Sequence, residues 1–157
     1  MIIRLVTEAD MVALSTVKNF RDVETSYEIT RHRLSKMAEG QAFYLVAVEA
    51  DKIIGHAFLK LDGKTTQPDF PDIQDVYVHP NFRTLGVATS LLTECERLVM
   101  QHGFSRIGLA VGINDYALPA RNLYKKLGYI SLGTESYVDG VYDGEKDWVI
   151  DMAKKLA

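Results

Sequence analysis

Between residues 73 and 99, a strand-like run leads through a short turn directly into an amphipathic helix. The strand covers residues 73–78 and stops at Pro80, because proline cannot donate to a sheet ladder. From Val87, apolar residues recur at helical spacing through Val99, with charged residues on the other faces. A strand that feeds a helix in this way predicts a sheet with helices packed on it.

The rest of the chain supplies the other elements of that fold. Polar residues 49–52 separate two strand-like runs as a hairpin connection would, and residues 62–71 predict an exposed loop. We expect an α/β fold in the order βααβββαβαββ, with a mixed, mostly antiparallel central sheet flanked by helices. The predicted strands are 2–6, 43–48, 53–60, 73–78, 107–111, 129–132 and 142–152, and the helices lie before Arg21, over 25–39, from Val87 and over 120–127.

Length, charge and cysteine content exclude several classes of protein. The chain has 157 residues, a net charge of −3 and one cysteine, which fits a single domain over 1–157 without disulfides. No apolar run approaches the ~18 residues of a membrane span, and the N-terminus has no signal-peptide pattern. We therefore expect a cytoplasmic protein with no membrane partner. The negative net charge argues against nucleic-acid binding, and the four histidines lack ligand-like spacing, so no metal is expected.

The turn before the helix at Val87 has the features of an anion site. Unpaired backbone N–H groups and the positive end of the helix dipole meet there, and Gly86 and Ala88 leave room for a phosphate. Taken alone, these two residues are explained at least as well by a tight turn and close helix packing. A P-loop and a dinucleotide-binding loop are excluded, because the lysine of the first and the glycine pattern of the second are missing.

Two ordered motifs add to this observation. Arg83-x-x-Gly86-x-Ala88 follows a V-x-V-x-P strand end, and residues 120–129 read ARNLYKKLGY. They resemble the R/Q-x-x-G-x-G/A pyrophosphate loop and the A-x-x-L-Y-x-x-x-G-F/Y segment of the GNAT family of acyl-CoA-dependent N-acetyltransferases. The motifs cover about residues 73 to 130, and the predicted order of elements is similar to that of the family over the whole chain.

The resemblance implies where acetyl-CoA would bind. The cofactor would lie between the strand ending at Val78 and the strand over 107–111, which would splay apart, and the backbone of Val76 and Val78 would contact its pantetheine and thioester end. Asn114 is a further expected contact. The family often has an asparagine three residues before the helix alanine, whereas Asn114 lies six residues before Ala120 and three before Ala117. The residues expected to hold the pyrophosphate are Arg83, Thr84, Gly86, Val87, Ala88 and Thr89.

Acetyl transfer to an amine requires a proton acceptor. An alkyl amine with a pKa of about 10 is mostly protonated at neutral pH and must lose a proton before it attacks. Asp75, or a water bound to Gln74 and Asp75, can take that proton from a position near the thioester. Strand alternation turns these two side chains to opposite faces, so only one would face the site unless the strand bulges. A solvated strand acid explains Asp75 equally well.

The leaving thiolate requires a proton donor. Periodicity alone places Tyr124 in a helix core, but the resemblance implies that it is the general acid and also a cofactor contact, with Tyr116 as an alternative phenol. Cys95 shares an apolar stripe with Leu91 and Leu98, which indicates a buried structural thiol rather than a nucleophile. Transfer is therefore expected to be direct, within a ternary complex.

These expectations lead to one function with two alternatives. The first is an N-acetyltransferase acting on a primary amine of a small molecule or peptide. The second is a non-catalytic acyl-CoA-binding or regulatory domain, and an RNA-associated module ranks last. Acids at Asp22, Glu24 and Glu28, together with residues 61–70, would favour a cationic amine or simply form a solvated surface. The closing strands, with Tyr137, Tyr142 and Trp148, could pair with a second copy in a homodimer or merely close the sheet.

Overall fold

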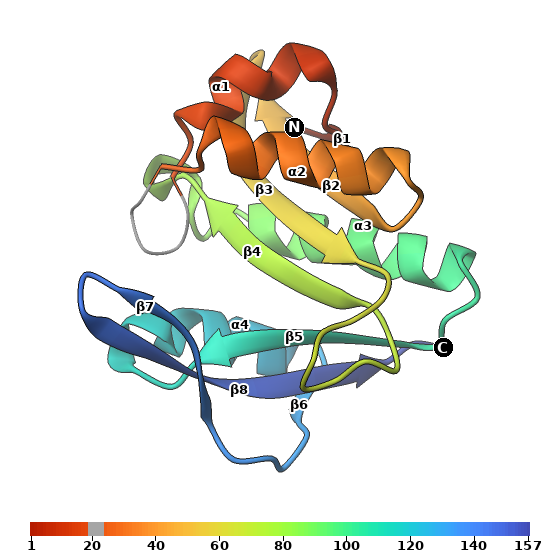
Figure 1. Cartoon of the computed structure of the whole chain (residues 1–157), viewed down its shortest axis with the longest axis vertical. Helices are drawn as coiled ribbons and strands as arrows, with labels where there is room; N and C mark the ends of the chain where they lie inside the picture. Colours follow the sequence, from red (N-terminus) through yellow and green to blue (C-terminus); the bar gives the residue numbers. More distant parts are fainter. Residues whose placement is uncertain (19–23) are drawn as a thin grey trace.

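The computed structural model describes residues 1–18 and 24–157. Its described strands form one mixed sheet in the order β1-β2-β3-β4-β5-β8-β6, with β7 paired to β8. Helices α1 and α2 cover one face and α3 and α4 the other (Figure 1), which confirms the predicted α/β class. The strands are β1 (Ile2–Leu5), β2 (Ala42–Glu49), β3 (Lys52–Lys60), β4 (Asp72–Val78), β5 (Arg106–Gly112), β6 (Ile130–Ser131), β7 (Tyr137–Tyr142) and β8 (Glu145–Lys155). The helices are α1 (Met11–Ser15), α2 (Tyr27–Ala38), α3 (Val87–Gln101) and α4 (Leu118–Lys126).

The first four strands form an antiparallel meander. The turn between β2 and β3 places Ala50 and Asp51 at φ 48° and 63°, the positive values that a two-residue hairpin turn of type I′ requires. This confirms the predicted hairpin. Helix α3 packs behind the meander, with Leu91 and Cys95 fully buried in the larger core cluster, so the amphipathic pattern identified the correct face.

Strands β4 and β5 are parallel and separate soon after they begin. They pair only at Asp72 with Gly108 and at Ile73 with Leu109. Beyond these pairs the two strands diverge toward their carboxyl ends (Figure 1). The sheet therefore opens into a V whose arms are the distal parts of β4 and β5, which is the splaying that the resemblance implied.

The C-terminal strands differ from the prediction. The expected strand over 129–132 shrinks to β6, and the expected strand over 142–152 is one arm of a hairpin in which Tyr142 ends β7. Asp143 and Gly144 form the turn with φ of 52° and 80°. An Asp-Gly pair between two β-rich runs is a strong signal for a type I′ hairpin. Strands β7 and β8 thus pair with each other within the chain.

The segment between β3 and β4 is also less exposed than predicted. Phe70 is buried and occupies the space beside Gly108, where an added Cβ would come within 2.9 Å of its ring. Gln67 is buried as well, and the Lys64 ammonium binds the Asp151 carboxylate of β8 at 2.6 Å. This loop therefore anchors the closed end of the V.

Asp72 lies at that closed end, and its ionisation makes the stability of the fold depend on pH. It is 1% exposed, and burial raises its pKa from 3.8 to about 6. The folded protein holds this proton more tightly than the unfolded chain, so stability is lost as the pH rises from about 4 through about 6. Asp72→Asn should remove the loss and gain about 3 kcal/mol over the wild type at pH 7, but little at pH 4.

Urea unfolding at several pH values, with the exposed Asp69→Asn as the control, measures this difference. A gap between Asp72→Asn and the wild type that stays constant with pH would contradict the prediction.

Candidate functional site

Strand β4 contains a bulge at Asp75. Two of its residues, Asp75 and Val76, lie opposite the single residue Ala57 of β3. The φ of Asp75 is 54°, a left-handed conformation that aspartate adopts more readily than most residues. The bulge interrupts the alternation, so Gln74 lines a pocket under α2 and Asp75 also bonds to that helix. Both polar side chains therefore face the same side of the sheet.

Arg33 of α2 holds the Asp75 carboxylate. Its guanidinium lies 2.8 Å from Oδ2 of Asp75, and the two side chains are 12% and 13% exposed. A second guanidinium nitrogen donates to the Tyr44 hydroxyl at 3.0 Å, and the guanidinium stacks over the rings of Tyr44 and Phe58. These contacts fix the carboxylate from one side.

His56 completes this buried cluster as a neutral ring. Its Nε2 lies 3.4 Å from the carbonyl oxygen of Lys18, which can only accept, so we assign the ring proton to that nitrogen. Its Nδ1 then accepts from the Tyr44 hydroxyl at 3.4 Å. Burial lowers the pKa of His56, which agrees with a neutral imidazole beside the Arg33–Asp75 pair.

One oxygen of Asp75 remains available. Its Oδ1 is buried and has no hydrogen-bond partner among residues 1–18 and 24–157. Such an atom is costly unless a ligand or water completes it. Sequence reasoning identified Asp75 but missed Arg33, Tyr44 and His56. The sequence offered only an indirect signal for these partners, because an acid on a strand that faces a helix needs a cation on that helix.

The turn before α3 has the geometry of an anion site. Gly86 adopts φ 84°, a left-handed conformation that favours glycine, and the space beside its Cα is open. The first helical bond runs from Ser90 N–H to Gly86, so the three preceding amides have no partner within the helix. The first turn of α3 carries no acid, and these residues therefore fit a pyrophosphate.

The other expected cofactor contacts lie around the opening. Arg83 donates from Nε to the carbonyl of Val78 at 2.9 Å, which ties the turn to the end of β4. The side chains of Val76 and Val78 pack toward the core under α3. Asn114 follows β5 at the other arm, where its carbonyl accepts from Arg121. The expected residues thus lie on both arms of the V and in the turn behind it.

Tyr124 belongs to α4, which packs on β5. Its ring meets Tyr129 edge-to-face, and burial raises the pKa of Tyr124 to about 12, so the phenol keeps its proton at neutral pH. No hydrogen bond joins its hydroxyl to another residue in the described part of the chain. The alternative phenol, Tyr116, donates instead to the buried Asp147. Tyr124 is therefore the freer proton donor of the two.

Cys95 is a structural thiol. It is fully buried inside the core cluster, and burial raises its pKa far above the ordinary range. A thiol that cannot ionise or meet substrate is a poor nucleophile. This agrees with the expected direct transfer.

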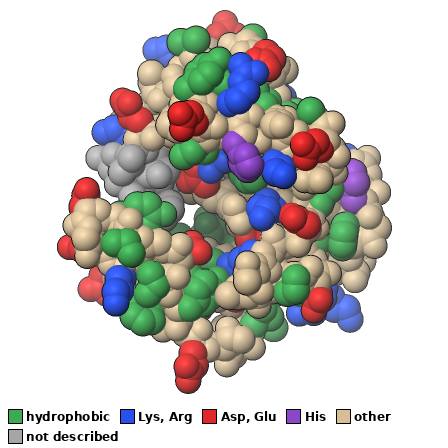
Figure 2. Space-filling view, viewed as in Figure 1, with side chains coloured by type: hydrophobic (Ala, Val, Ile, Leu, Met, Phe, Trp, Pro, Cys, Tyr) green, Lys and Arg blue, Asp and Glu red, His purple; other side chains and the backbone are tan. Residues whose placement is uncertain are grey.

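The pocket beside Asp75 has a different charge from the one expected on the acceptor side. Of the three acids named from the sequence, Glu28 lines it, Glu24 does not, and Asp22 lies outside the described residues. Lys and Arg side chains gather around a histidine over the middle of this face, above a hollow in the molecule (Figure 2). The pocket lining thus combines three cations, Arg33, Lys36 and Lys60, with two acids, Glu28 and Asp62, the second of which lies in the predicted range 61–70.

Comparisons with known proteins agree with this geometry. The structure superposes on a ribosomal-protein-alanine N-acetyltransferase from Brucella melitensis (TM-score 0.81, 21% identity, 99% of this chain and 100% of that chain). It also matches an N-acetyltransferase from Staphylococcus aureus, with a TM-score of 0.80 and 14% identity over 99% of this chain and 98% of that chain. A third match is a phosphinothricin acetyltransferase from Sinorhizobium meliloti in complex with acetyl-CoA. Its TM-score is 0.77 and its identity 20%, over 99% of this chain and 88% of that chain. At these identities the likeness establishes the fold.

Sequence comparison adds the family. The sequence matches none of the curated proteins. In the described ranges, no helix is long and apolar enough to cross a membrane. The model of the acetyltransferase (GNAT) family matches residues 9–129, a stretch that includes both arms of the V, the turn before α3 and Tyr124. The chain belongs to the acetyltransferase (GNAT) family.

Proposed function

We propose that this acetyltransferase moves an acetyl group from acetyl-CoA to a primary amine of a small molecule or peptide, by direct attack in a ternary complex. Residues 1–157 act in this proposal as a single N-acetyltransferase domain. The observation that carries it is the buried, unpartnered Oδ1 of Asp75 on one arm of the open V. A free carboxylate oxygen at that place suits an amine that must lose a proton.

The chain offers separate groups for each part of the cofactor. When bound, acetyl-CoA supplies the activated acyl carbon and a thiol leaving group. The amides at the start of α3, with Arg83 and Thr84 of the turn, would hold the pyrophosphate, since they combine a helix N-terminus, a cation and open space at Gly86. Backbone groups of Val76 and Val78 and the region of Asn114 would hold the pantetheine on the two arms. The remaining turn contacts are Val87, Ala88 and Thr89.

Two side chains would move the protons. Oδ1 of Asp75, directly or through a bound water, accepts the proton that the amine gives up while Arg33 keeps the carboxylate in place. The hydroxyl of Tyr124 donates a proton to the departing sulfur, and solvent later restores it. The base would lie on β4 and the acid on α4, which packs on β5, so the two protons would be handled at separate places.

Thiol release tests this function. Acetyl-CoA should release free thiol in the presence of at least one class among polyamines, aminoglycosides, amino acids and N-terminal peptides, and calorimetry should show cofactor binding without any acceptor. Binding with no release across the panel would favour the non-catalytic acyl-CoA-binding alternative. Absence of binding would overturn the proposed cofactor site.

Arg83 allows the cofactor site to be tested separately from the chemistry. Arg83→Met should weaken acetyl-CoA binding by about 10- to 100-fold, the effect of losing one charged hydrogen-bond donor. Its contacts are with the turn and the end of β4, so the fold should persist. Arg97→Met is the control, because Arg97 is exposed on α3, the helix that follows this turn, and pairs with Glu94. Equal weakening by both variants in calorimetry would show a general charge effect instead.

A further inference from the structure

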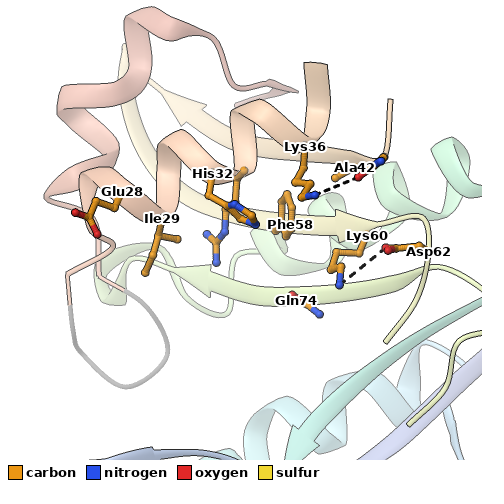
Figure 3. A pocket seen from close by; sticks show the side chains of 11 residues that line it. Glu28, Ile29, His32, Lys36, Ala42, Phe58, Lys60, Asp62 and Gln74 are labelled. Atoms are coloured by element: carbon orange, nitrogen blue, oxygen red, sulfur yellow. Dashed lines mark hydrogen bonds and ion pairs between the residues drawn. The ribbon is translucent and has the colours of Figure 1, made fainter. Parts of the chain in front are cut away.

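The pocket beside Asp75 has the size of a small-molecule site. It measures about 500 Å³ and lies between α2 and the strands β3 and β4 (Figure 3), within the range of about 300–1,000 Å³ typical of small ligands. Arg33 and Gln74 line it, and they are respectively the partner and the chain neighbour of Asp75. Asp75 itself does not line the pocket, so an acceptor held there would have to reach its carboxylate past Arg33 and Gln74.

The basic residues of this pocket differ in how firmly they are held. Arg33 is committed to Asp75 and Tyr44 by short contacts. Lys36 and Lys60 are held by longer contacts, with Glu39 at 3.7 Å and Asp62 at 3.9 Å, and Lys36 also donates to Oε1 of Gln41 at 3.3 Å. Charged hydrogen bonds are about 2.7–2.9 Å long. Both ammonium groups are therefore held only by long, exposed contacts, which a ligand can replace at little cost.

The acids of the pocket lie farther out than these lysines. The side chain of Asp62 is 72% exposed, against 36% for Lys60 and 40% for Lys36. Glu28 lies at the opposite end of the pocket from the lysines, which approach from α2 and β3 at one end (Figure 3). That end thus presents two lysines at the pocket wall, with the more exposed Asp62 beside Lys60, and His32 adds a third nitrogen-bearing side chain.

We infer that Lys36 and Lys60 bind an anionic group, a carboxylate in the first instance, of a small acceptor whose amine reaches Asp75. The inference rests on the proposed function and deepens it, since it names an amino acid or similar amino carboxylate as the substrate class. It reverses the expectation of a cationic acceptor drawn from Glu28 and its neighbours. A lysine ammonium attracts an anion as a point charge, without the planar two-point geometry of an arginine guanidinium. The charge of the anion should therefore matter more than its shape.

Matched acceptors test this inference. Glycine, β-alanine and γ-aminobutyrate are compared with their amides as acceptors in acetyl-CoA-dependent thiol release. At least one acid should exceed its amide about tenfold in kcat/KM, the effect of two partly exposed ion pairs. The difference should lie in KM and should shrink as salt is added.

A double variant supplies the specific control. Lys36→Gln with Lys60→Gln should bring the kcat/KM of each acid close to that of its amide. Lys52→Gln with Lys155→Gln removes the same charge from two exposed lysines that do not line the pocket, and it should keep the preference.

The outcomes separate the anion site from the acetyltransferase function on which it rests. Equal rates for acids and amides, or a preference that survives the Lys36–Lys60 variant, would overturn the anion site and leave the acetyltransferase function in place. If no amine is acetylated, calorimetric binding of the same acids and amides to the CoA-saturated protein decides, and equal affinities would overturn the inference.

Discussion

Asp75→Asn should lower the rate of acetyl transfer by about 10²- to 10⁴-fold, the range for loss of a positioned general base. Asparagine keeps the size of the side chain and can still accept from Arg33, but its amide cannot take a proton at the position of Oδ1. Calorimetric affinity for acetyl-CoA should stay within about twofold, because the side chain faces α2 rather than the turn at Gly86. Thiol release under saturating acetyl-CoA measures the loss.

Arg33 shows whether Asp75 acts as the geometry indicates. Arg33→Met removes the partner of a buried carboxylate and should both destabilise the fold and slow the reaction. Arg33→Lys keeps the charge and should recover part of the rate. If Arg33 works through Asp75, adding Arg33→Met to Asp75→Asn should slow the reaction little further. Full multiplication of the two losses would show that Arg33 acts independently of Asp75, and a nearly normal rate for Asp75→Asn would remove Asp75 from the mechanism.

The elements around this site could be read from the sequence because their signals are local. Apolar spacing identified α3, and Pro80 marked the end of β4. The turn at Gly86 was recognisable because its left-handed conformation and the unpaired helix amides both depend on neighbouring residues. The splaying of β4 from β5 followed from the family resemblance, and no single residue in either strand encodes it.

The buried polar cluster could not be read in the same way. Arg33 and Asp75 are 42 positions apart, and their contact depends on how α2 crosses the sheet. The bulge at Asp75 arises from the pairing of β4 with β3, so the period-two pattern of the strand alone gives the wrong face for one of its two polar residues. The β7–β8 hairpin is a different case, because its Asp143–Gly144 signal was present in the sequence.

The charge distribution on the acceptor side could not be predicted from the sequence either. Glu28 and Lys36 are both on α2, but they line opposite ends of the pocket, and Lys60 reaches it from another strand. The acids along the chain were compatible with a cationic amine or with a solvated surface, whereas the three-dimensional arrangement places two lysines at one end of the pocket. If this pocket takes the acceptor, as we propose, its specificity depends on which charges share a wall of the pocket.

Tyr124→Phe should lower kcat by about 10²-fold, the lower end of the range for acid catalysis, because a thiolate is already a fair leaving group without protonation. The variant removes a hydroxyl that bonds to no other described residue, so the melting temperature and the acetyl-CoA affinity should change little. The raised pKa of about 12 keeps the phenol protonated across the neutral range, and the rate loss should therefore be the same from pH 6 to pH 8.

Tyr116→Phe is the matched control for this loss. It removes the donor to the buried Asp147, so it should lower the melting temperature while kcat stays near that of the wild type. Parallel measurement of kcat and melting temperature separates the two tyrosines. The opposite pattern, a normal kcat for Tyr124→Phe and a large loss for Tyr116→Phe, would transfer the role of proton donor to the entry loop of α4.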